Sequence, residues 1–290
     1  MKRIGHSFLS VITALIICLV LPSCNREEAL PVYLDMNNTQ IRLSNSGKIT
    51  NLGLRDIWVD HNSERLGVFR HPAIVPMIPQ ETNVLTFSGG VFETGLSSSR
   101  IRYPFWQSTV MEVDAAPLDT VPIRMTIEYF SDSVLAYPLV EEFEGSSLAF
   151  TVLNEGEPAS LDQPTAGAFD GTRSGRVRFS DSERNFEMVS TDFLALPQNG
   201  NNDIYVEVTY RNNIPFTAGL FFANSAEVGE LPSNVFFDSN LEWNTAYIHV
   251  NDQVRGTTQG SLFKLYLRAN GGGADGVIFF DNIRIVHFRE

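Results

Sequence analysis

Apolar and polar residues alternate in short runs along most of the chain after residue 30. In the segment 204–210 every second residue is apolar, and the segment 263–268 has the same alternation. The runs are rich in Val, Ile, Phe, Tyr and Thr, and Gly, Pro, Asn and Asp separate them at intervals typical of turns. A period of two places neighbouring side chains on opposite faces of a strand, whereas helical periodicity is almost absent. The pattern predicts an all-β protein built from half-buried antiparallel strands.

The predicted strands fall into two groups, which we interpret as two β-sandwich domains. We expect the first domain at residues 31–130 and the second at 139–290, with a linker at 131–138. The strands expected in the first domain are 32–34, 49–59, 65–69, 83–87, 107–113 and 123–129.

The first 23 residues have the character of an export signal. Lys2 and Arg3 precede an apolar run at 8–21 that is short for a membrane span, and Leu-Pro-Ser-Cys follows at 21–24. This order resembles a bacterial lipoprotein signal peptide, and a transmembrane anchor or an ordinary secretory signal is the alternative. The resemblance implies cleavage before Cys24, acylation of that residue, for example with palmitate, and a tether at 24–30.

Asn25-Arg26-Glu27-Glu28 follows the acylation site. It resembles the short acidic tract that sends Bacteroidota lipoproteins to the cell surface, and the start of a solvated linker is the alternative. The resemblance implies a protein of the outer membrane that faces the periplasm or the cell surface. Because Cys18 would leave with the signal, the mature chain has no disulfide and depends on an ordinary core.

The charge balance restricts the partners. The formal net charge is -13, and loss of Lys2 and Arg3 would make the mature chain more negative. Nucleic acids and anionic lipid surfaces both select basic patches. We therefore expect no nucleic-acid partner, and we expect the membrane to be reached through the lipid on Cys24.

Residues 56–76 read as a strand, a polar turn, a second strand that contains Leu66-Gly67, and a strand bounded by prolines. This order loosely resembles the small β-domains known by the PEGA pattern, and prealbumin-like sandwiches in general. The chain departs from that pattern where Asn62-Ser63 stands in place of a glycine-containing turn.

An aromatic cluster surrounds Pro104, which disfavours a central strand. Tyr103, Phe105 and Trp106 are therefore candidates for an exposed loop that binds a partner. A loop folded onto its own core is the alternative.

The segment 276–288 reads as a strand with a carboxylate in an apolar row. On a period of two, Phe279, Asp281, Ile283 and Ile285 share one face. An ionised carboxylate in a core is costly unless it is paired. Asp281 therefore requires hydrogen-bond donors, a metal ion, or a β-bulge that turns it outward.

Four stretches of the second domain follow one another in an order known from one group of domains. They are Glu142-Phe-Glu-Gly145, Phe169-Asp-Gly-Thr-Arg-Ser-Gly-Arg-Val177, Trp243-Asn-Thr-Ala-Tyr-Ile-His249 and Phe280-Asp-Asn-Ile-Arg-Ile-Val286. Together they resemble the jelly-roll domains of carbohydrate-binding modules and their galactose-binding-like relatives. The resemblance implies a jelly-roll sandwich at 139–290 and a structural calcium ion held by Glu142, Glu144 and Asp281. Backbone amides or an arginine bound to Asp281 are the alternative.

No motif identifies a catalytic site. Gly171-Thr-Arg-Ser-Gly175 has the wrong spacing for a nucleophile elbow, no histidine pair has the spacing of zinc ligands, and no pair of carboxylates is singled out for glycoside hydrolysis. We expect a protein that is not an enzyme, with calcium as its one possible cofactor.

Two functions remain open. The first is binding of a glycan or an envelope protein, for which exposed aromatic residues are needed; the candidates are Tyr205, Tyr266, Trp243 and Tyr247, although Trp243 also suits a core. The second is a structural or assembly role as an accessory lipoprotein of an outer-membrane secretion or gliding machine, through the loop at Tyr103, Phe105 and Trp106.

Overall fold

The computed structural model describes residues 29–37, 40–42, 53–94, 98–153, 156–199, 202–231 and 235–289. The signal segment and Cys24 lie outside these residues. The elements are β1 (Val32–Asp35), β2 (Gln40–Arg42), β3 (Asp56–His61), β4 (Glu64–Arg70), β5 (Ile74–Met77), β6 (Val84–Phe92), β7 (Arg100–Arg102), β8 (Thr109–Glu112), β9 (Thr120–Pro122), β10 (Thr126–Glu128), β11 (Leu135–Glu141), β12 (Phe150–Leu153), β13 (Leu161–Asp162), β14 (Gly175–Phe179), β15 (Asn185–Ser190), β16 (Ile204–Asn212), β17 (Phe216–Ala223), β18 (Val228–Glu230), β19 (Val235–Phe237), β20 (Asn240–His249), α2 (Asn251–Arg255), β21 (Leu262–Asn270) and β22 (Gly276–Phe288). The all-β prediction is confirmed. No helix among the described residues has the length and apolar character that a membrane crossing requires.

The N-terminal body contains β1 to β10. One sheet has the order β4-β3-β6-β7 with β8 also on β6, a second has the order β5-β1-β9, and β10 pairs with β2. Alternate residues of β1 and β3, such as Leu34 and Val59, are fully buried in its core. The β3–β4 turn places both Asn62 and Ser63 at positive φ, 51° and 69°. Asn tolerates that conformation, so the hairpin closes without the glycine that the PEGA pattern prefers.

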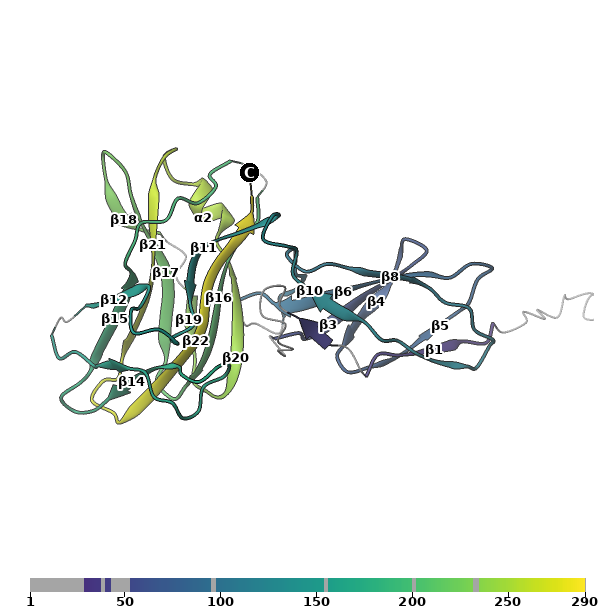
Figure 1. Cartoon of the computed structure of the whole chain (residues 1–290), viewed down its shortest axis with the longest axis horizontal. Helices are drawn as coiled ribbons and strands as arrows, with labels where there is room; N and C mark the ends of the chain where they lie inside the picture. The colour runs from purple at the N-terminus through teal and green to yellow at the C-terminus, as the bar shows by residue number, and fades with distance from the viewer. Residues whose placement is uncertain are drawn as a thin grey trace, which may run out of the picture.

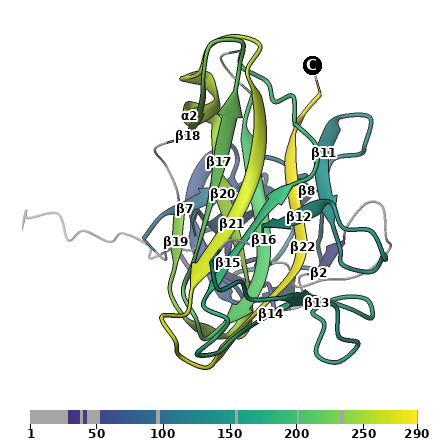
Figure 2. The same cartoon turned by 90° about the vertical axis from the view of Figure 1, so that its left-hand side faces the viewer.

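The C-terminal body is a sandwich of two sheets that lie face to face (Figure 2). The first sheet, which we call the inner sheet, has the order β13-β14-β22-β16-β20, with β11 also on β22. The second, the outer sheet, has the order β12-β15-β21-β17-β18, with β19 also on β17. Alternate apolar residues of both sheets, such as Val206, Val208, Leu265 and Leu267, form the core between them. Residues 135–138, which we expected in a linker, belong to β11.

A β-bulge in β22 changes the face that Asp281 occupies. Ile278 and Phe280 lie in the core before the bulge, and Ile283 and Ile285 lie in the core after it. The pairing with β16 shifts register at this point, and Asn282 has φ 44°. The expectation that Asp281 shares a row with Ile283 and Ile285 is therefore wrong, because one extra residue turns Asp281 to the outside of the inner sheet.

The two bodies form one elongated molecule. The N-terminal body packs on the outside of the inner sheet, near β16 and β20, and the outer sheet faces the opposite way (Figure 1). β1 and β5 lie at the end of the N-terminal body that points away from the C-terminal body (Figure 1). The described chain therefore begins at one end of the molecule, and the outer sheet forms the other.

Candidate functional site

Five of the seven aromatic residues that we expected on the surface meet at the junction of the two bodies. Tyr103, Phe105, Trp106, Tyr205 and Tyr247 are at most 4% exposed and belong to one apolar cluster. The ring of Tyr103 lies 5.3 Å from that of Tyr205 and 4.8 Å from that of Tyr247. The predictions of an exposed partner loop and of Tyr205 and Tyr247 as ligand platforms are therefore wrong. The loop at 103–106 does have a partner, but that partner is the second body of the same chain.

A buried ion pair lies beside this cluster. The guanidinium of Arg284 is 2.6 Å from Oε2 of Glu207, whose side chain is 2% exposed. The hydroxyl of Tyr129 donates to both oxygens of Glu207 at 3.1 Å, and the hydroxyl of Tyr103 also donates to Glu207. Burial, followed by the charge of Glu207, raises the pKa of Tyr103 well above its ordinary value, so this hydroxyl stays a donor. Two residues of each body therefore form one closed polar network.

A histidine closes the edge of the junction. His249 stacks on Tyr205 with ring centroids 4.7 Å apart. Its Nε2 lies 3.3 Å from Oδ1 of Asp203, and its Nδ1 lies 3.5 Å from Oε1 of Glu93, which belongs to the N-terminal body. Contact with Asp203, opposed by burial and aided by the charge of Glu93, raises the pKa of His249. In its charged form His249 therefore joins the two bodies.

The three predicted calcium ligands do not form one group. Asp281 accepts backbone N–H bonds from Phe169 at 3.0 Å, Asp170 at 3.2 Å and Asn282 at 2.9 Å. Glu144 accepts from the amides of Thr172 and Arg173, at 2.6 and 2.8 Å, and Glu142 is exposed.

Among the described residues no set of three His, Cys, Asp or Glu side chains is arranged to hold a metal ion. The geometry instead matches the alternative, in which backbone amides beside a β-bulge donate to Asp281. Glu142, Glu144 and Asp281 do not fit a calcium site. Burial raises the pKa of Asp281 to about 7, against the amide donors, which lower it.

The sequence-based reasoning passed over Glu141 in favour of its neighbour. Glu141 is 5% exposed and accepts from the amides of Phe143 at 2.7 Å and Ala149 at 2.5 Å. It holds the loop after β11 as Asp281 holds the loop before β14.

Tyr266 lies on the outside of the outer sheet but is covered. Its ring crosses Gly219, where an added Cβ would lie 2.3 Å from the hydroxyl oxygen, so only glycine fits there. The guanidinium of Arg268 stacks on the ring at 4.0 Å and pairs with Glu230 at 3.0 Å, while the hydroxyl of Tyr266 donates to Glu230. Tyr266 is 0% exposed, so the prediction that it offers an open platform is wrong.

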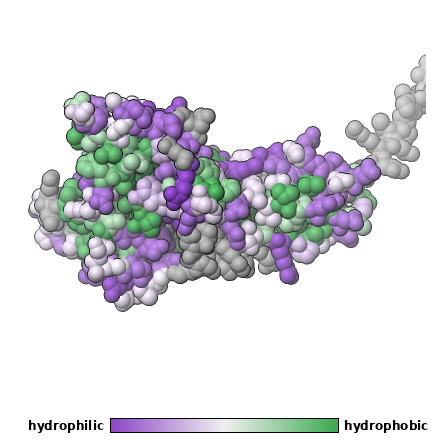
Figure 3. Space-filling model, turned by 45° about the horizontal axis from the view of Figure 1, so that its top comes forward, coloured by the Kyte–Doolittle hydropathy of each residue, from purple (hydrophilic) through white to green (hydrophobic). Residues whose placement is uncertain are grey.

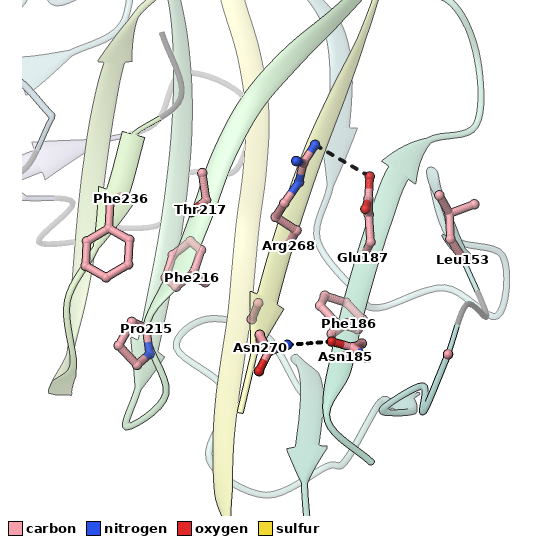
Figure 4. A pocket seen from close by; sticks show the side chains of 12 residues that line it. Leu153, Asn185, Phe186, Glu187, Pro215, Phe216, Thr217, Phe236, Arg268 and Asn270 are labelled. Carbon is pink, nitrogen blue, oxygen red and sulfur yellow. Dashed lines mark hydrogen bonds and ion pairs between the residues drawn. The ribbon is translucent and has the colours of Figure 1, made fainter. Parts of the chain in front are cut away.

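Beside Arg268 a groove of about 780 Å³ crosses the lower end of the outer sheet (Figure 4). Its lining residues come from β12, β15, β21, β17, β19 and the adjoining turns: Leu153, Gly156, Asn185, Phe186, Glu187, Pro215, Phe216, Thr217, Phe236, Arg268, Ala269 and Asn270. Phe236 is 66% exposed. Asn270 donates to Asn185 at 2.7 Å, and Arg268 lies 3.8 Å from Glu187.

The groove combines one open aromatic face with amide, hydroxyl and paired ionic groups. Such a surface can bind apolar faces and hydroxyl groups of the same ligand. Sequence reasoning missed it, although Phe236 alternates with the buried Phe237 and was therefore detectable as an outward residue. The pair of Glu187 and Arg268 depends on the register of β15 and β21, which no local pattern reveals.

Trp243 is the remaining predicted ligand residue, and it lies on the inner sheet. It is half-buried, and its ring centroid lies 5.7 Å from that of Phe169 and 6.3 Å from that of Phe279. It is thus neither a core residue nor part of the groove.

No family model matches the chain, and no curated protein matches it. Solved structures with similar architecture include the CBM22-1 xylan-binding domain of Xyn10C from Paenibacillus barcinonensis, at 12% identity over 53% of this chain and 96% of that one, with a TM-score of 0.37. The family 11 carbohydrate-binding module from Clostridium thermocellum, in complex with a mixed-linked tetrasaccharide, is 14% identical over 52% and 95%, with a TM-score of 0.37. TmCBM61, in complex with β-1,4-galactotriose, is 18% identical over 51% and 91%, with a TM-score of 0.34. At these values the likeness concerns β-sandwich architecture and does not bear on what this chain binds.

We predict that Glu207→Ala destabilises the protein by about 3–5 kcal/mol, because it leaves Arg284 buried without a counter-charge. Denaturant unfolding measures this change. Glu157→Ala is the control, since Glu157 pairs with Arg184 at 3.1 Å on the surface and its loss should cost less than about 1 kcal/mol. Equal losses in the two variants would contradict the assigned role of the buried pair.

The junction should weaken at alkaline pH. Because the folded-state pKa of His249 is raised, its contribution to stability is complete below the unfolded value, about 6.5, and disappears as pH rises through the folded value. The melting temperature of the wild type relative to His249→Gln should therefore be higher at about pH 5.5 than at about pH 9. Glu93→Gln should reduce this difference, and a difference independent of pH would exclude the ionic contact.

Asp281→Ala should lower the free energy of unfolding by about 2 kcal/mol or more. Each buried amide donor that is left without an acceptor costs about 1–3 kcal/mol. Asp281→Asn, which keeps one acceptor oxygen, should cost less. Asp275→Ala, on the exposed β21–β22 turn, should stay within about 0.5 kcal/mol of the wild type. The same thermal measurement with calcium and with chelator should show no shift in melting temperature, because the three carboxylates do not share a site.

Proposed function

We propose that the C-terminal sandwich is a non-catalytic polysaccharide-binding module whose ligand lies in the groove of the outer sheet. The observation that carries this proposal is the open ring of Phe236 beside Asn185, Asn270 and Thr217 in one groove. On the face shown in Figure 3, apolar surface is more extensive on the C-terminal body than on the N-terminal body.

The lining suits a sugar chain in two ways. The C–H face of a sugar ring packs on Phe236, and its hydroxyls exchange hydrogen bonds with the amides of Asn185 and Asn270, which already hold each other in place. The groove is open along the sheet, so an internal segment of a polymer has access without a free chain end.

The charges in the groove favour a neutral glycan. Arg268, the one cation among the described lining residues, contacts both Glu187 and Glu230, so its charge is offset before a ligand carboxylate arrives. The same pairing opposes a hydrolytic role, since both carboxylates are occupied as acceptors of one guanidinium, whereas glycoside hydrolysis requires one acid and one base or nucleophile on either side of the scissile bond.

We further propose that the protein is a lipoprotein anchored through Cys24 in the outer membrane. The chain enters at the end of the N-terminal body that is opposite the outer sheet (Figure 1). An anchor on that side leaves the groove pointing away from the membrane, toward soluble or cell-surface polysaccharide.

The assembly role in a secretion or gliding machine is the second hypothesis from the sequence. Its support was the aromatic loop at Tyr103, Phe105 and Trp106, which the junction buries. The exposed groove therefore favours glycan binding over that role.

Phe236→Ala should weaken binding of a neutral polysaccharide about tenfold, which corresponds to ~1.4 kcal/mol for the loss of one stacked ring. A glycan array identifies the polymer, and calorimetry with the mature chain measures the affinity. Val228→Ala is the matched control, since Val228 is 78% exposed and does not line the groove. Binding that is unchanged in Phe236→Ala, or a wild type that binds no glycan, would exclude the proposal.

A further inference from the structure

A second surface of the C-terminal body combines arginine and aromatic side chains. Arg176 on β14, Phe279 on β22, Arg211 on β16 and Trp243 on β20 lie on consecutive strands of the inner sheet. Phe279 is directly opposite Arg176 on one side and Arg211 on the other. We call these four residues the arginine–aromatic row.

The row faces outward. Its neighbours along the strands, among them Val177, Tyr210 and Phe280, lie in the core, so alternation turns the row to the other face. The N-terminal body covers the adjacent part of this face, where Gly53 lies against Tyr247 and Thr245. Trp243, Phe279, Arg211 and Arg176 remain half-buried.

Arg211 is held by rings and not by a carboxylate. Its guanidinium carbon lies 4.4 Å from the centroid of Phe279 and 5.3 Å from that of Trp243. Among the described residues it forms no ion pair, and Gly167 lies against its Nη2, where an added Cβ would be 3.2 Å away. Cation–π contacts leave the edge of a guanidinium free to donate to an anion.

The row is locally basic in an acidic protein. Arg176 donates to Asp162 through both Nε, at 2.8 Å, and Nη2, whereas Arg178, which is 60% exposed, lies 3.8 Å from the same carboxylate. Asp281, two residues after Phe279 on the same face, and its neighbour Asp170 offset part of this charge, so Arg178 and Arg211 are the cations without a close carboxylate partner in a chain of net charge -13. This surface therefore attracts negative groups that the rest of the molecule repels.

We propose that the arginine–aromatic row binds an acidic polysaccharide of the polyuronate class. Strands are spaced about 4.8 Å apart, so Arg178 on β14 and Arg211 on β16, two strands apart, are separated by at least about 10 Å. A single small anion does not bridge that distance, whereas a polymer with repeated carboxylates does. The guanidinium groups of Arg178 and Arg211 then each bind a carboxylate, and the ring of Trp243 packs against a sugar face.

A uronate chain suits the row better than a nucleic acid. Nucleic acids also stack on aromatic rings, but their binding relies on many neutralised phosphates, and among the described residues only Arg178 and Arg211 are available on this surface. The arginine–aromatic row is also independent of the groove, because the two surfaces lie on different sheets and Arg268 of the groove is already paired with carboxylates.

The test is calorimetric titration of the mature chain with polygalacturonate and with the same polymer fully methyl-esterified. We expect binding of the acid form, no binding of the ester, and affinity that falls as salt rises. Arg211→Met should weaken binding at least tenfold, and Arg211→Lys should retain part of it. Arg124→Met is the matched control, since it removes the same charge from an exposed site on the N-terminal body and should bind as the wild type.

Arg178→Met separates loss of binding from loss of folding, in case Arg211→Met does not fold. Arg178 is 60% exposed, so its replacement should weaken binding without a change in melting temperature. Phe236→Ala should leave polygalacturonate binding unchanged. The proposal for the groove and the proposal for the row can therefore be refuted separately. Equal binding of acid and ester, equal affinities of Arg211→Met and Arg124→Met, or equal binding of a single-stranded oligonucleotide would overturn the proposal.

Discussion

The ion pair of Glu207 and Arg284 is the interaction on which the arrangement of the molecule depends. Both residues belong to the C-terminal body, but their remaining hydrogen-bonding capacity is met by Tyr103 and Tyr129 of the N-terminal body. Without those hydroxyls, Glu207 and Arg284 would be buried under aromatic rings with some of their hydrogen-bonding groups unsatisfied, which is destabilising. Separating the two sandwiches would therefore expose the apolar cluster and break the polar network at the same time.

The junction also decides which surfaces remain available. It occupies the middle of the inner sheet, leaves the outer sheet uncovered, and leaves one end of the inner sheet open at the arginine–aromatic row. These two open surfaces differ in charge. In the groove Arg268 is shared by two carboxylates, whereas in the row Arg211 forms no ion pair among the described residues and Arg178 beside it lies 3.8 Å from its nearest carboxylate. One molecule thus offers a neutral surface and a basic one, each with an aromatic ring beside its polar groups.

The bulge in β22 positions residues of both the junction and the arginine–aromatic row. It turns Asp281 out of the core, where three backbone amides hold it, and it keeps Ile283 and Ile285 inside. Because of the same shift of register, Phe279 and Arg284 both point to the outside of the inner sheet, and Arg284 lies opposite Glu207. A strand of regular alternation would place one of these groups in the core at high cost.

The sequence by itself determined the class of structure. Alternation in segments such as 204–210 identified the strands, and the Asp281-Asn282 pair between apolar residues indicated that something interrupts the last one, because period and turn chemistry are local properties. Which outward aromatic residue stays exposed was decided only by the tertiary structure. Tyr205 and Phe236 both alternate with core residues, yet one is covered by Tyr103 and the other is open. Burial of an outward face depends on what packs against it, and that contact joins residues about a hundred positions apart, which no local pattern encodes.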